Sequence, residues 1–78
     1  MYDYSKLYGK IREVYGTQEA FAAAIGMHKA TLSLRLTGKK EWKLSEVISA
    51  CELLKIPFEE AHLYFFVRKA VKFTAREA

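Results

Sequence analysis

The stretch HKATLSLRL, residues 28–36, holds the side chains best suited to binding another molecule. It carries two hydroxyl residues, three leucines, two basic side chains besides its histidine, and no acid. In a helix each residue turns by about 100°, so Leu32 and Leu36 share a buried face and Leu34 lies opposite. Short and apolar side chains on that outward side fit the DNA major groove, where methyl groups meet thymine and polar groups reach base edges. The spacing predicts DNA base contacts by Lys29, Ala30, Ser33 and Leu34. For Leu34, a protein–protein contact or an isolated exposed leucine are the alternatives.

Polar and basic residues on either side of this stretch are suited to phosphate. Gln18 is expected at a helix N-terminus, where free N–H groups and the helix dipole attract anions. The basic run GKKEWK, residues 38–43, follows the stretch, with a solvated loop as the alternative. The predicted phosphate contacts are Gln18, His28, Thr37, Lys39, Lys40 and Lys43. His28 is also the expected N-cap of the stretch. Trp42 would either seal the core or lie against the DNA backbone.

Composition indicates one small basic domain, residues 1–78. The chain has 78 residues and a net charge of +4, which permits nucleic-acid binding. Cys51 is the one cysteine, so no disulfide forms within the chain and a reducing bacterial cytoplasm is expected. No apolar run approaches the ~18 residues of a membrane span.

The chain has no constellation of residues that points to catalysis. His28 and His62 are far apart in sequence, and no acid or cysteine cluster has metal-ligand spacing. No glycine-rich loop matches a nucleotide phosphate cradle. We therefore expect no catalytic residues, and no metal, cofactor or small-molecule ligand.

Apolar spacing and glycine punctuation predict five helices. They are expected at residues 4–15, at 18–25 after an N-cap at Thr17, at about 29–37, after Leu44 or Ser45 as far as Leu54, and at about 58–64. Gly16, Gly26 and Gly38 are expected to end the first three. The predicted inward residues are Leu7, Ile11 and Val14 on the first helix, and Leu44, Val47, Ile48, Cys51 and Leu54 on the fourth.

The segment after these helices, residues 65–78, fits a strand by alternation and a helix by other spacings. We favour an extended segment. The first four helices already supply a core, so the apolar residues here would remain on the monomer surface. They predict a dimer interface of Phe65, Phe66, Val67, Val71 and Phe73. In the alternative, some of them, Phe65 first, close the core of the monomer.

The central segment TQEAFAAAIGMHKATLSLRLTGK, residues 17–39, has the spacing of a helix-turn-helix. Gln18 opens its first helix, Ala22 is small enough for a close helix crossing, and Gly26 makes the sharp turn. The segment resembles the helix-turn-helix of repressor and Cro-type regulators of temperate bacteriophages. With the flanking helices the resemblance covers residues 5–64, and the whole chain is similar to short repressors of phages of Gram-positive bacteria.

This resemblance implies an all-α, five-helix, lambda-repressor-like domain, with its helix-turn-helix at residues 17–38 and a dimerisation segment at residues 65–78. It also implies a phage repressor that binds a palindromic double-stranded DNA operator as a homodimer. Arg35 departs from the family, which usually has an apolar residue there. The alternative function is an antirepressor or antitoxin-like regulator that binds another protein through its third helix or its C-terminal aromatic residues.

Overall fold

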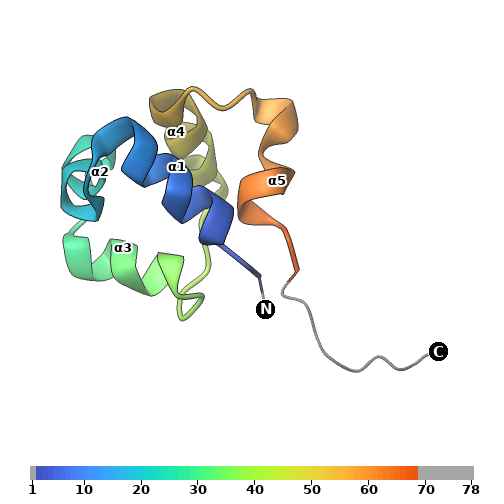
Figure 1. Ribbon diagram of the computed structural model, residues 1–78. Helices are drawn as coiled ribbons and strands as arrows, with labels where there is room; N and C mark the ends of the chain where they lie inside the picture. The colour runs from blue at the N-terminus through green and yellow to red at the C-terminus, as the bar shows by residue number, and fades with distance from the viewer. Residues whose placement is uncertain (1, 69–78) are drawn as a thin grey trace.

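The computed structural model describes residues 2–68. In chain order they form α1 (Ser5–Tyr15), α2 (Gln18–Ile25), α3 (Lys29–Leu36), α4 (Leu44–Leu54), the 3-10 turn η1 (Phe58–Glu60) and α5 (His62–Phe65) (Figure 1). Extended pairing in this part of the chain is limited to one antiparallel bridge, between Tyr2 and Arg68. The predicted all-α fold is therefore confirmed for residues 2–68. Val71 and Phe73, two of the predicted dimer contacts, lie outside the described residues.

The helices are arranged around α1, which packs against α2, α4 and α5. Figure 1 shows α5 beside α1, and α3 at the edge of the bundle. Helix α3 packs chiefly against α2. The other side of α3 is therefore left at the surface of the described part.

Local caps set the ends of α2 and α3. Thr17 Oγ1 accepts a hydrogen bond from the Ala20 N–H at 3.0 Å, at the start of α2. Gly26 ends α2 with a φ of 77°, in the left-handed region that favours glycine. His28 Nδ1 accepts from the Ala30 N–H at 3.2 Å and caps α3, as predicted. Because such signals are local, the predicted boundaries of the first four helices hold to within two residues.

The predicted fifth helix, residues 58–64, is two shorter elements. The Pro57 carbonyl accepts from the Glu60 N–H at 2.8 Å, and the Phe58 carbonyl accepts from the Ala61 N–H at 3.0 Å. These bonds span three residues, so the first turn is a 3-10 turn. Helix α5 begins after Ala61, which is buried. The prediction of one continuous helix is wrong because the chain tightens after Pro57 and brings Ala61 into the core.

The core is built from apolar side chains of all five α-helices and the segment after α4. Its buried members are Leu7, Ile11, Phe21, Ala22, Leu32, Val47, Ala50, Cys51, Leu54, Ile56, Ala61 and Phe65. Val14, Leu44 and Ile48, predicted to face inward, are exposed instead. On α4 the buried strip includes Ala50 in place of Leu44 and Ile48. Apolar spacing locates a stripe on a helix, but the neighbouring helices decide which part of the stripe is covered.

Phe65 closes the core of the monomer. Its side chain is 1% exposed, and its ring packs edge-to-face on Trp42 with the centroids 5.0 Å apart. The prediction that Phe65 forms a dimer contact is therefore wrong, and its alternative holds. The same packing places Trp42 against the core rather than on an outer surface. Phe66 and Val67 are exposed, and their role in a dimer stays a prediction.

Candidate recognition surface

The outward side of α3 is formed by Lys29, Ala30, Ser33 and Leu34, and we call these four residues the α3 face. All four are exposed, Leu34 to 38%. Leu32, on the inward side, is fully buried, so the expected orientation of α3 is observed. The base contacts assigned to the α3 face stay predictions.

A groove of about 360 Å³ separates the start of α2 from α3. It is lined by Gln18, Glu19, His28, Lys29, Ala30 and Ser33. Across it, Lys29 Nζ lies 3.3 Å from Glu19 Oε2, and both side chains are largely exposed. Exposed ion pairs contribute at most about 1 kcal/mol, so the contact is easily broken. While it holds, the α3 face together with Glu19 carries no net charge.

The second basic residue of α3, Arg35, points inward to a carboxylate on α4. Its Nε and Nη2 donate to the two carboxylate oxygens of Glu46, at 2.9 and 3.0 Å. The pair is largely covered, with the side chains 11% and 19% exposed. The Arg35 hydrogen bond is the main cause that lowers the pKa of Glu46; burial opposes it, and the Lys43 N–H adds a further hydrogen bond at 2.9 Å. Arg35 is therefore committed to joining α3 to α4.

Glu46 is absent from the sequence-based predictions of the site. The available signal was Arg35, which stands where the resembling family has an apolar residue and therefore needs a carboxylate partner. The identity of that partner depends on how α4 packs, because Glu46 is eleven residues away in sequence.

The six residues predicted to contact phosphate differ in how free their polar atoms are. Thr37 Oγ1 donates to the Ser33 carbonyl at 2.9 Å and so completes the end of α3. His28 uses Nδ1 as a cap, and Gln18 is half-buried. Lys39, Lys40 and Lys43 are exposed on the segment between α3 and α4. These three lysines are the best placed of the six, and their phosphate contacts stay predictions.

A larger groove, of about 510 Å³, adjoins the α3 face at Ser33. It is lined by Tyr2, Asp3, Tyr4, Ser5, Tyr8, Gln18, Ser33, Leu36 and Thr37. Three of these residues are tyrosines, and we call it the tyrosine groove. Tyrosine is enriched at protein interfaces, because its ring supplies apolar area and its hydroxyl supplies a hydrogen bond.

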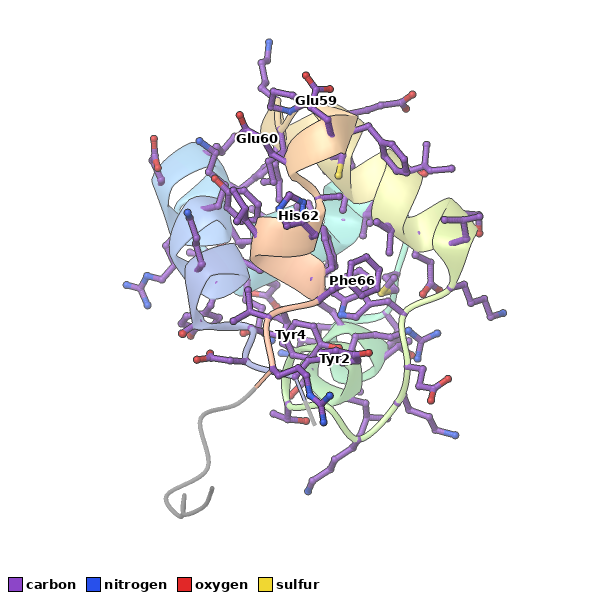
Figure 2. All side chains as sticks on the ribbon, turned by 90° about the vertical axis from the view of Figure 1, so that its right-hand side faces the viewer. Tyr2, Tyr4, Glu59, Glu60, His62 and Phe66 are labelled. Atoms are coloured by element: carbon purple, nitrogen blue, oxygen red, sulfur yellow. The ribbon has the colours of Figure 1, made fainter. Side chains whose placement is uncertain are left out.

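The N-terminal segment is held against the end of α5. The Asp3 N–H donates to the Val67 carbonyl at 2.7 Å, and the Tyr2 ring packs edge-to-face on Phe66 with centroids 5.9 Å apart. Figure 2 shows Tyr2 and Tyr4 gathered below α5, near Phe66. Burial is the main cause that raises the pKa of Tyr4 above its ordinary value. These tyrosines were missed from sequence because only the fold brings the N-terminal segment beside α3; the signal was the run MYDYSKLY.

Other kinds of site find little support in residues 2–68. No group of three or more His, Cys, Asp and Glu side chains there is arranged to hold a metal ion. No helix in that part is long and apolar enough to cross a membrane. Cys51 is buried, and burial raises the pKa of its thiol, which is the environment of an unreactive cysteine. The α3 face and the tyrosine groove are therefore the main candidates for recognition.

Comparisons with known proteins point to a bacteriophage regulator of similar fold. Residues 1–68 match the model of a family described as "Protein of unknown function (DUF739)". The chain is also similar to the modulator of repression (MOR) of the temperate bacteriophage TP901-1 from Lactococcus lactis, known from a solution structure. The two are 45% identical and superpose with a TM-score of 0.75, over 83% of this chain and 88% of that one. A comparison with curated proteins gave no match.

Proposed function

The chain belongs to the DUF739 family, and from this premise and the geometry of α3 we propose that it is a phage regulator of repression that binds another regulatory protein. The binding surface is the α3 face with the adjoining tyrosine groove. The similarity to a phage modulator of repression supports the regulatory role. The proposal takes up the antirepressor-like alternative expected from the sequence, and it assigns the protein no reaction, metal or cofactor.

The observation that carries this proposal is the make-up of α3, whose one covered basic side chain, Arg35, is committed to Glu46, so that Lys29 is left as the single basic residue of the α3 face. Lys29 pairs with Glu19, and Arg35 pairs with Glu46. A helix that reads DNA uses such side chains on phosphates and guanine edges. Here the α3 face instead offers the exposed Leu34, and Ser33 of the same face lines the tyrosine groove. Protein interfaces typically have this mixture, in which aromatic and apolar anchors carry much of the binding energy.

Leu34→Ala tests the protein-binding surface. The purified protein is titrated by calorimetry with the repressor of the same phage. We expect binding to weaken at least about tenfold, because the change removes apolar contact area from the α3 face. Leu63→Ala is the matched control, since Leu63 on α5 is also 38% exposed. Equal losses in the two variants, or no loss in either, would mean that α3 is not the contact.

Sequence-specific DNA binding is the second candidate function. Helix α2, the turn at Gly26 and α3 have the order and lengths of a helix-turn-helix, which favours this role. The N-terminus of α2 and the exposed lysines of residues 38–43 are suited to phosphates. In a homodimer, two α3 helices would read half-sites about 34 Å apart on a palindromic operator.

Selection from a random duplex pool, followed by salt titration, separates the two functions. If the protein reads DNA, Ser33→Ala changes the selected sequence. Replacing Lys39, Lys40 or Lys43 by glutamine then lowers the salt slope of log affinity by about 1 per lost phosphate contact. If the protein binds a partner protein instead, no sequence is enriched. A palindromic consensus that depends on Ser33 or Leu34 would replace the protein-binding proposal with operator binding.

A further inference from the structure

Helix α4 and η1 expose apolar residues that the α3 face and the tyrosine groove do not use. Leu44, Ile48 and Phe58 are 67%, 40% and 58% exposed. A groove of about 260 Å³ lies between these elements, and we call it the α4–η1 groove. It is lined by Ile48, Cys51, Glu52, Ile56 and Phe58. Cys51 and Ile56 are buried, so the groove has an apolar base between two exposed apolar side chains.

The surroundings of this groove are acidic although the protein as a whole is basic. Glu52, Glu59 and Glu60 are exposed, and Lys55 is the only basic residue from 44 to 60. The fourth carboxylate of that range belongs to Glu46, which is already paired with Arg35 of α3. The exposed charged residues of this stretch, Glu52, Lys55, Glu59 and Glu60, thus carry a net charge of −2 in a chain of net charge +4. An occupant should combine an apolar anchor with positive charge.

The segment that follows the described residues has this composition. Residues 69–78 read KAVKFTAREA, with three basic side chains, one acid, and the apolar residues Val71 and Phe73. The groove is slightly smaller than the about 300–1,000 Å³ of small-molecule pockets, which suits one or two apolar side chains. We propose that the α4–η1 groove of one copy binds residues 69–78 of a second copy, with Phe73 as the anchor and Lys69 and Lys72 near the acidic groups.

The start of this segment favours a second copy over the same copy. Arg68 is paired with Tyr2, which fixes where residues 69–78 begin. Figure 2 shows Glu59 and Glu60 at the end of the molecule opposite Tyr2, with α5 between them. Phe73 is five residues beyond Arg68, a reach of at most about 18 Å when fully extended. When two copies exchange these segments, each gives and receives the same contact, as a two-fold dimer requires.

Sedimentation of the full chain over a range of concentrations tests the proposal. We expect a reversible dimer whose dissociation constant rises at least about tenfold in Phe58→Ser and in Phe73→Ser. Phe66→Ser is the matched control, because Phe66 is similarly exposed, to 50%, but lies outside the groove. Phe58 and Phe66 are at least half exposed and Phe73 lies outside the described residues, so circular dichroism should show an unchanged helix content. A wild-type chain that stays monomeric at millimolar concentration overturns the proposal, as does a dimer that only Phe66→Ser disrupts.

Charge reversal identifies the pairing directly. Glu59→Lys with Glu60→Lys should weaken the dimer, and Lys69→Glu with Lys72→Glu should weaken it as well. In a dimer of the two double variants, one contact pairs the introduced lysines with the introduced glutamates, and the other contact keeps the wild-type charges. A chain with all four changes has the reversed pairing in both contacts. We expect the combined variant to recover wild-type affinity to within about threefold. Additive weakening in the combined variant would show that these charges do not meet. The proposal does not rest on partner binding by α3, and its outcome leaves the titrations with repressor and DNA unaffected.

Discussion

The guanidinium of Arg35 is paired inside the fold and therefore adds no free positive charge to the surface of α3. It meets both oxygens of Glu46, and Glu46 also accepts the Lys43 N–H at the start of α4. The guanidinium, the carboxylate and the Lys43 N–H thus all have hydrogen-bond partners in a partly buried place, where an unpaired charge would be costly. The contact joins α3 to α4, while the packing of α3 is chiefly against α2.

Glu46→Gln should lower the free energy of unfolding by about 1.5–3 kcal/mol at neutral pH, the range for a hydrogen bond to a charged group. The pKa of Glu46 is lowered in the folded protein. Its contribution is therefore present above the ordinary glutamate pKa of about 4.3 and is lost as the pH falls through the lower folded value. Urea unfolding between pH 7 and pH 3 should show wild type and variant converging at the acid end.

Glu13→Gln provides the control for this experiment. Glu13 is 70% exposed and lies 3.9 Å from Lys10 in a surface pair, so its loss should change the free energy of unfolding by less than about 0.5 kcal/mol. A Glu46→Gln variant that differs from wild type by the same small amount at every pH would show that the Arg35 contact does not stabilise the fold.

At the scale of elements, the sequence predicted what is decided locally. Thr17, Gly26 and His28 set helix ends through contacts within a few residues, and those ends were placed correctly. The outward side of α3 was also predicted, because Leu32 and Leu36 fix the helix phase. The exposure of Ile48 and the approach of the N-terminal tyrosines to α3 were not predicted. Both depend on how elements that are distant in sequence pack together, and the spacing of apolar residues along one helix gives no information on that packing.

The turn between α2 and α3 can be tested by comparing two glycines. An added Cβ would meet no atom within 4 Å at either Gly9 or Gly26, so crowding is absent at both positions. Gly26 has a φ of 77°, where a side chain costs about 1–2 kcal/mol, and Gly26→Ala should destabilise by that amount. Gly9 lies inside α1, where Gly9→Ala should instead stabilise by about 0.5–1 kcal/mol. Thermal unfolding of both variants checks the opposite signs; a shift of the same sign would contradict the assigned backbone conformations.

At the scale of the whole molecule, recognition groups are divided between separate surfaces. The α3 face, the tyrosine groove and the three lysines adjoin α3, whereas the acidic groups surround α4 and η1. One copy therefore has room for a regulatory partner on α3 and for a second copy on the α4–η1 groove. The proposed partner contact and the proposed contact between copies therefore use different surfaces of the same molecule.

Phe65, at the end of α5, shows that the fold needs the chain at least as far as this residue. Sequence alone assigned Phe65 to a dimer surface, because counting apolar residues does not tell how many a core requires. In the structure Phe65 is 1% exposed and packs on Trp42, so Phe65→Ala should lower the free energy of unfolding by about 3–5 kcal/mol. Domains have only about 5–15 kcal/mol in total, so a chain that stops after Tyr64 should lose a large part of its stability.

Phe66→Ala is the matched comparison, since its ring is next in sequence but 50% exposed. We expect its effect on the free energy of unfolding to stay below about 1 kcal/mol. Urea unfolding should be measured at several protein concentrations, because a contact between copies stabilises more as concentration rises, whereas a contact within the monomer does not. A Phe65→Ala loss that grows with concentration would return Phe65 to a dimer interface, while a constant loss keeps it in the core of each copy.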